Sequence, residues 1–177
     1  PERHRARVAD MATYAHDFGA AIEAEQGSLP VGSSGIVESD GSALTDPEAA
    51  AEFVAQTGID LLSVSVGNTH IMVRDQCELD LDRLARIGRL VAIPLSLHGG
   101  SGIRSGSLAQ AIRLGVAKVA YGTYLKQRWL DSLRNAIGGA HTNPHRYLGM
   151  GGSEDLMVVG RRAVRDAVLE RIEYLGC

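Results

Sequence analysis

The sequence is poor in the residues that mark several common classes of protein. It has only two cysteines, Cys77 and Cys177, in 177 residues, too few for a disulfide framework or a paired-cysteine zinc site. Aromatic residues make up 5% of the chain and its formal net charge is −3, so we expect no basic surface for nucleic acid. No apolar run approaches the roughly 20 residues that a membrane helix needs, and the first residues lack the apolar stretch of a signal peptide. We therefore expect a cytoplasmic protein with neither nucleic acid nor a membrane as its partner.

What the chain does contain is typical of a globular α/β protein. Hydrophobic residues make up 45% of it, charged residues 22%, and there are 21 glycines. Four apolar runs of strand length each end in polar or glycine residues: 19–25, 59–67, 91–99 and 116–123. Near-continuous apolarity of this kind is typical of parallel strands buried on both faces. We predict four such strands.

Helical patterns lie between these runs. They cover residues 3–18, 45–58, 80–91, 107–115, 124–138 and 154–175. The pattern at 45–58 carries clear end signals, because Thr45 or Asp46 suits the N-cap, Pro47 the first turn and Gly58 the end of the helix. Alternation of strands and helices predicts a parallel sheet with crossover helices. The expected order is a helix, four βα units and a longer terminal helix.

A long segment without periodicity interrupts this alternation. Residues 27–43, "GSLPVGSSGIVESDGSA", are rich in glycine and serine. Long loops in compact domains tend to be lids or binding loops. We interpret this one as a mobile lid, with a neutral surface insertion as the alternative.

Two histidines stand where two neighbouring strands are expected to end. His70 ends the second strand and His98 ends the third, and parallel α/β folds collect function at such carboxyl ends. Two imidazoles from neighbouring strands could reach one metal ion, for which zinc is the leading candidate. Glu25, at the end of the first strand, could add a carboxylate. The alternatives are hydrogen-bonded structural histidines and a solvated strand-end charge.

Glycine-rich turns follow two of the strands. Gly99-Gly100-Ser101-Gly102 comes directly after His98, and Tyr121-Gly122-Thr123 ends the next strand. Backbone N–H groups at glycines and a serine hydroxyl favour an anion, so the two turns could form a phosphate site. The alternative is two ordinary turns. His141 and His145 are spaced as a helical pair, but Asn143-Pro144 breaks the helix, so we predict a surface connection there without a metal.

Several stretches together resemble the class II, zinc-dependent fructose-bisphosphate and tagatose-bisphosphate aldolases. They are "IEAEQG", "LTDPEAAAEFVAQTGIDLLSVSVGNTH", "LDLDRL", "IPLSLHGGSGI", "AIRLGVAKVAYGT" and "AVRDAVLERIEYLG". The resemblance implies a (β/α)₈ TIM barrel, of which residues 1–177 would supply about the last four βα units plus a C-terminal helix. They would form the C-terminal part of a single barrel domain whose earlier strands lie outside these residues. The alternative is a half-barrel that completes its sheet with another chain.

The resemblance also implies a function and its residues. Zinc would stabilise the enediolate of dihydroxyacetone phosphate or a related phosphorylated ketone, which adds to an aldehyde. His70 and His98 correspond to two of the family's three zinc histidines, and Glu25 to the acidic, catalytic residue near the metal. Gly99, Gly100 and Ser101, with Ala120, Tyr121, Gly122 and Thr123, correspond to the phosphate-binding loops, beside which a monovalent cation could bind. The terminal helices would join subunits into a homodimer or homotetramer.

Four departures from the family pattern bear on substrate and activity. The Asp-His pair that carries the family's third zinc histidine does not occur in these residues. Ile71 stands where the family usually has glycine, and Ala120 where it has a substrate-binding asparagine. The lid's acidic residue would fall near Ser33 or Ser34, with Glu38 and Asp40 as nearby substitutes. We therefore hypothesise a divergent aldolase with a changed substrate.

Two other functions compete with an aldolase. A non-catalytic relative would keep the barrel and bind a sugar phosphate or a partner, as the missing lid acid and Ala120 would allow. A metal-free phosphate-binding barrel enzyme, such as an isomerase, leaves the paired histidines His70 and His98 unexplained. Zinc in the intact protein would separate the first of these from the aldolase.

Overall fold

The computed structural model describes residues 2–30, 44–73, 76–138 and 143–176. The chain forms two compact units, Pro1–Tyr121 and Gly122–Cys177. The candidate functional residues Glu25, His70 and His98 all lie in the first unit. That both units belong to one barrel domain stays a prediction.

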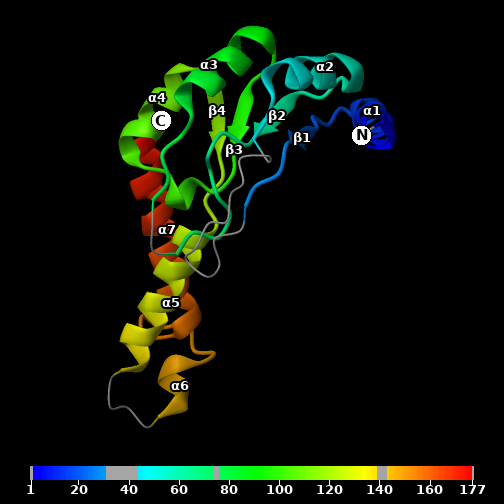
Figure 1. Cartoon of the computed structure of the whole chain (residues 1–177). Helices are drawn as coiled ribbons and strands as arrows, with labels where there is room; N and C mark the ends of the chain where they lie inside the picture. The colour runs from blue at the N-terminus through cyan, green and yellow to red at the C-terminus, as the bar shows by residue number, and fades with distance from the viewer. Residues whose placement is uncertain (1, 31–43, 74–75, 139–142, 177) are drawn as a thin grey trace. The chain divides into compact units, whose positions relative to one another are not determined.

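A four-stranded parallel sheet forms the centre of the first unit (Figure 1). Its strands, in the order β1-β2-β3-β4, are Glu23–Gln26, Leu61–Val64, Leu95–Leu97 and Val116–Val119. Each strand pairs in parallel with the next one along the chain. This sequential order is that of consecutive strands in a βα barrel. The predicted α/β class and the four βα units of a partial barrel are confirmed.

Helices cover one face of this sheet. Figure 1 shows α2 (Pro47–Thr57), α3 (Leu81–Leu90) and α4 (Ser105–Arg113) on the same side of the strands. The buried side chains that these helices contribute are Ala50, Phe53, Leu84, Ile87, Leu108 and Ala111. They face the buried strand residues Leu62, Val64, Leu95 and Leu97. The N-terminal helix α1 (Glu2–Asp17) packs against α2.

The other face of the sheet is polar. Side chains alternate along a strand, and the register pairs Glu25 with Ser63, Ser63 with Ser96, and Ser96 with Lys118. Glu23 and His98 lie on the same face by this alternation. The prediction of strands buried on both faces holds for β3 and for β2 from Leu62 on, whereas β1 and β4 are only partly buried. The helix-covered face is apolar, and the opposite face carries charged and hydroxyl groups.

The strands are also shorter than predicted. β1 begins at Glu23 instead of residue 19. Gly19 lies in the turn that follows α1: it has φ +69°, and its N–H donates to the carbonyl of His16. β4 ends at Val119, since Thr123 already begins a helix. Helix signals were more exact. Asp46 is the N-cap of α2 and accepts the N–H of Ala49, as one of the two predicted caps.

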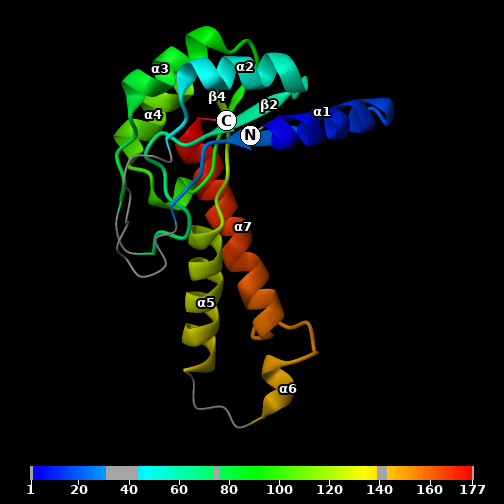
Figure 2. The same ribbon diagram turned by 45° about the vertical axis from the view of Figure 1, so that its right-hand side comes forward.

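The second unit is helical. Figure 2 shows α5 (Thr123–Ile137) and α7 (Leu156–Leu175) running side by side in opposite directions. A Cβ on Gly160 of α7 would lie 2.7 Å from the Trp129 ring of α5, so glycine permits this close packing. The predicted surface connection contains a one-turn helix, α6 (Pro144–Tyr147), and its His145 is exposed, while His141 lies outside the described residues. No described helix is both long and apolar enough to span a membrane.

Candidate metal centre

Three predicted ligands come together at the carboxyl ends of the strands. Glu25 belongs to β1, His98 directly follows β3, and His70 comes from the loop after β2. Each offers one ligand atom, and these atoms lie within 4.8 Å of one another. The rings of His70 and His98 are stacked with centroids 5.6 Å apart, and Nδ1 of His98 lies 3.4 Å from Oε2 of Glu25. The structure thus brings the three predicted residues together.

His70 reaches this cluster from a loop, which corrects its predicted place at a strand end. β2 already ends at Val64, and the chain turns before it returns to His70. The main-chain N–H of His70 donates to the carbonyl of Pro30, 2.9 Å away. The loop therefore crosses toward the segment that follows β1, and this crossing carries the imidazole to the site.

A buried asparagine, which sequence reasoning missed, fixes that loop. The side-chain N–H₂ of Asn68 donates to the carbonyls of Val64 (3.2 Å) and His98 (3.1 Å), and its oxygen accepts the N–H of Val66 (2.8 Å). Asn68 has no exposed surface, so these bonds satisfy a side chain that would be costly to bury unpaired. They tie the loop of His70 to the backbone of His98. The Gly-Asn pair in "VGNTH" is typical of a turn, but it does not indicate the bond to His98.

Thr45 joins the ends of the first two strands. Its hydroxyl donates to the carbonyl of Gln26 (2.5 Å) and accepts the N–H of Ser65 (2.8 Å). Its own N–H donates to the carbonyl of Ser65 (2.8 Å). Sequence analysis considered Thr45 only as a helix cap. Its observed role is to hold the strand end of Glu25 beside the start of the loop that carries His70.

A glycine contact brings the two histidine segments close. Gly99 follows His98 at φ +69°, and a Cβ there would lie 2.2 Å from the carbonyl oxygen of Thr69. Thr69 immediately precedes His70. Only glycine permits both this backbone angle and this approach.

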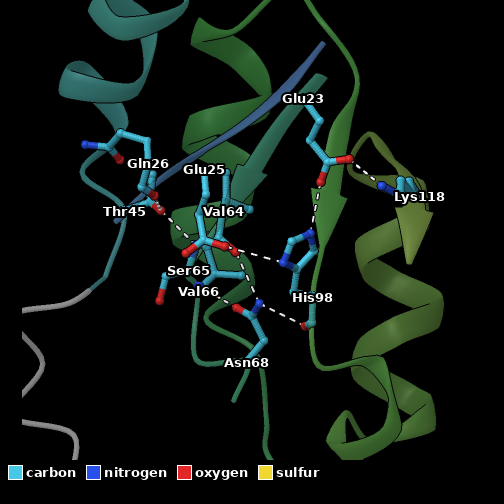
Figure 3. Close-up of polar contacts among 10 residues, drawn as sticks. All are labelled: Glu23, Glu25, Gln26, Thr45, Val64, Ser65, Val66, Asn68, His98 and Lys118. Atoms are coloured by element: carbon cyan, nitrogen blue, oxygen red, sulfur yellow. Dashed lines mark hydrogen bonds and ion pairs between the residues drawn. The ribbon is translucent and has the colours of Figure 1, made fainter. Parts of the chain in front are cut away.

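A second carboxylate, Glu23, contacts His98 from the opposite side (Figure 3). Its Oε1 lies 3.0 Å from Nε2 of His98, and its Oε2 is paired with Nζ of Lys118 on β4. Burial by itself would raise the pKa of Glu23, but the hydrogen bonds from Lys118 and His98 outweigh it and hold that pKa below its ordinary value. Sequence analysis missed both Glu23 and Lys118. The two-residue spacing of the glutamates in "IEAEQG" was the signal for Glu23.

The first predicted phosphate turn lies next to Ala120, where the second begins. Gly100–Gly102 form a single 3₁₀ turn, and the N–H of Gly100 donates to the carbonyl of Ala120 (3.0 Å). A Cβ on Gly100 would lie 2.5 Å from Cγ1 of Val119. The N–H of Gly100 is thus already hydrogen-bonded to Ala120. A side chain at position 100 would clash with Val119, so packing requires glycine there. Ser101 and Tyr121 belong to these same turns. Gly122 and Thr123 open α5 in the second unit, and their phosphate role stays a prediction.

Most of the predicted lid, residues 27–43, falls outside the part of the chain that the structure describes. Residues 31–43, which include Ser33, Ser34, Glu38 and Asp40, lie outside the described residues. The lid and its acidic residue therefore remain predictions from the sequence.

Ile71, next to His70, has a left-handed backbone with φ +56°. A β-branched residue is a genuine outlier there, and left-handed backbone costs an L-residue about 1–2 kcal/mol. We expect Ile71→Gly to raise the free energy of unfolding by up to about 1 kcal/mol, after the entropic cost of glycine is deducted. Urea denaturation of the purified protein measures this. Ile71→Ala is the matched control, since it removes the same exposed side chain but keeps a Cβ; equal stability of the two variants would contradict the strain.

The donor set of the cluster fits zinc. Two imidazole nitrogens and one carboxylate oxygen form the His₂Glu type of ligand set, which leaves a fourth position for water or substrate. The cluster contains no thiolate ligand. Cys77 is not one of its members, and its thiol donates a hydrogen bond to the carbonyl of Gly102. The centre is partly exposed, as a site for a small substrate requires.

Several known proteins are similar to this chain. The family model of class-II fructose-bisphosphate aldolase matches residues 2–177. The YdjI aldolase from Escherichia coli K12 is 30% identical with a TM-score of 0.75, and the match covers 99% of this chain and 56% of that one. A putative fructose-1,6-bisphosphate aldolase from Coccidioides immitis is 27% identical with a TM-score of 0.78, covering 99% and 58%. The fructose-bisphosphate aldolase of Campylobacter jejuni, 19% identical with a TM-score of 0.71, shares the fold.

The chain belongs to the class II fructose-bisphosphate aldolase family. The resemblance noted from the sequence motifs is confirmed. The chain spans 56% to 58% of the length of these solved structures, so it corresponds to a part of their barrels.

Proposed function

We propose that this chain carries the metal-binding part of a zinc-dependent aldolase. The observation that supports this most is the convergence of Glu25, His70 and His98 from three different segments, with their ligand atoms within 4.8 Å. The family match over residues 2–177 adds the reaction class. The proposed substrates are a phosphorylated ketone, such as dihydroxyacetone phosphate, and an aldehyde.

The residues would divide the work as follows. His70, His98 and Glu25 would hold the zinc ion, which supplies Lewis acidity toward a carbonyl oxygen. In the condensation direction a carbon–carbon bond forms between the ketone's α-carbon and the aldehyde carbon, a proton leaves the α-carbon, and a proton arrives on the aldehyde oxygen. One carboxylate oxygen of Glu25 faces His98, 3.4 Å away, and its other oxygen is our candidate for the acceptor of the α-proton.

Phosphate binding is proposed for the turns beside the metal centre. Ser101 supplies a hydroxyl, and the backbone of Gly99 passes close to the loop of His70. Ala120 and Tyr121 lie next to this turn through the bond between Gly100 and Ala120. Because Ala120 replaces a polar family residue, we propose a substrate other than fructose bisphosphate.

Location and assembly complete the proposal. We propose a cytoplasmic homodimer or homotetramer in which the terminal helices join subunits. The exposed apolar side chains of α7, among them Met157, Leu169 and Ile172, support such a contact.

The test is elemental analysis of the full-length protein, followed by an aldol-cleavage assay on a panel of phosphorylated ketoses. About one zinc per chain and metal-dependent cleavage of one ketose are expected. A zinc-free protein that still binds a sugar phosphate would favour the non-catalytic alternative, which the replacement of the family's asparagine by Ala120 allows.

A further inference from the structure

The His98 ring is held between two carboxylates. Glu23 and Glu25 lie on the same face of β1, since strand side chains alternate. Glu25 faces Nδ1 of His98 at 3.4 Å, on the side of His70, while Glu23 faces Nε2 at 3.0 Å. Figure 3 shows the imidazole between the two side chains. Each ring nitrogen therefore has its own carboxylate, and the two glutamates cannot have the same role.

Glu23 is itself anchored by a cation. Lys118 on β4 pairs with Oε2 of Glu23, which leaves Oε1 for His98. The side chain of Glu23 is 20% exposed, against 32% for Glu25. A charge-assisted bond to an ammonium group keeps a carboxylate ionised and directed. The contacts thus run from β4 through β1 to the residue after β3.

We propose that Glu23 and Lys118 are positioning residues that orient His98 for metal binding. In a neutral imidazole one nitrogen carries the proton and the other carries the lone pair. In this arrangement Nε2–H of His98 donates a hydrogen bond to Glu23, so the lone pair of Nδ1 is directed toward Glu25 and His70. A carboxylate in this place also raises the basicity of the ligating nitrogen. The inference rests on the proposed zinc function, and it assigns Glu23 outside the ligand set.

The first test is zinc affinity, measured on the full-length protein by competition with a chromophoric chelator. Glu23→Ala is expected to weaken zinc binding by about 10- to 100-fold. Glu23→Gln keeps an acceptor oxygen for Nε2–H and is expected to lose less. Glu48→Ala, which removes an exposed carboxylate paired with Arg86 on the same unit, is the control and should bind zinc normally. Wild-type affinity in Glu23→Ala would overturn the inference.

Variants of Lys118 test whether this residue acts on His98 through Glu23. If Lys118 acts through Glu23, Lys118→Met weakens zinc binding on its own but adds no further loss to Glu23→Ala. Such non-additivity is the mark of residues in one network. Fully additive losses would overturn the role given to Lys118. Equal urea midpoints among the variants separate lost orientation from lost folding.

A metal-free measurement distinguishes this inference from the proposed function. In protein labelled with ¹⁵N-histidine, we expect a slowly exchanging Nε2–H resonance of His98, identified by its absence in His98→Asn. It should disappear in Glu23→Ala and persist in Glu48→Ala. If the wild-type protein bound no zinc, the proposed function would fail, while this resonance would still decide whether Glu23 orients the ring. Its absence from the wild-type spectrum would overturn the inference.

Discussion

Replacement of His98 by alanine is expected to abolish zinc binding and to lower kcat/KM for aldol cleavage by about 10³-fold. His98 touches all other members of the centre: Glu25 at Nδ1, Glu23 at Nε2 and the His70 ring by stacking. A Lewis-acidic metal contributes several kcal/mol to the transition state, and each 1.36 kcal/mol is a factor of ten in rate. Zinc content by elemental analysis and steady-state kinetics on the full-length protein measure the two effects.

His145→Ala is the matched control for His98→Ala. His145 is an exposed histidine in the second unit, at the start of α6, so its removal should leave zinc content and kcat/KM unchanged. Full zinc content in His98→Ala would exclude His98 from the ligand set. Equal losses in both variants would indicate that histidine removal acts through general damage to the protein.

Gly99→Ala is expected to be the most destabilising single-methyl change among the described glycines of the site. Left-handed backbone costs alanine about 1–2 kcal/mol, and forcing a methyl group into a packed region adds about 1–3 kcal/mol. With a Cβ placed 2.2 Å from the Thr69 carbonyl oxygen, we expect a loss of about 2–5 kcal/mol in the free energy of unfolding. Zinc affinity should fall too, because the clash separates the segments of His70 and His98.

Gly58→Ala is the control that measures the cost of the left-handed backbone alone. Gly58 has φ +66°, close to the +69° of Gly99, but a Cβ there meets nothing within 4 Å. It should cost only the left-handed strain and leave zinc affinity intact. If urea denaturation gives the two variants the same loss of stability, the close contact between Gly99 and Thr69 has no energetic consequence.

The sequence was most informative where local signals act alone. Strand-length apolar runs alternating with helical patterns predicted the parallel βα order, and Asp46, Pro47 and Gly58 set the ends of α2 as expected. Strand limits were less accurate, because the apolar runs continue past the paired residues into the flanking turns, as at Gly19 before β1 and at Tyr121 after β4. Apolar character alone does not show where strand pairing begins or ends.

In the candidate site, too, some residues could be predicted from local signals and others could not. Glu25, His70 and His98 could be found from residue type and from their places near strand ends, with the family motifs in support. Asn68 and Lys118 could not, because their roles arise from contacts between distant segments. Lys118 meets Glu23 because β1 to β4 form one sheet and a register shift between β3 and β4 pairs Lys118 with Ser96. Asn68 matters because its loop returns to the carbonyl of His98, which no local pattern encodes.

The most direct test of the central claim is anomalous diffraction at the zinc absorption edge from crystals of the full-length protein. The account predicts one strong peak per chain, bounded by the side chains of Glu25, His70 and His98, with Nδ1 of His98 facing the peak and Glu23 outside its ligand sphere. A peak elsewhere, or no peak in crystals grown with zinc, would contradict the metal centre and with it the proposed aldolase function.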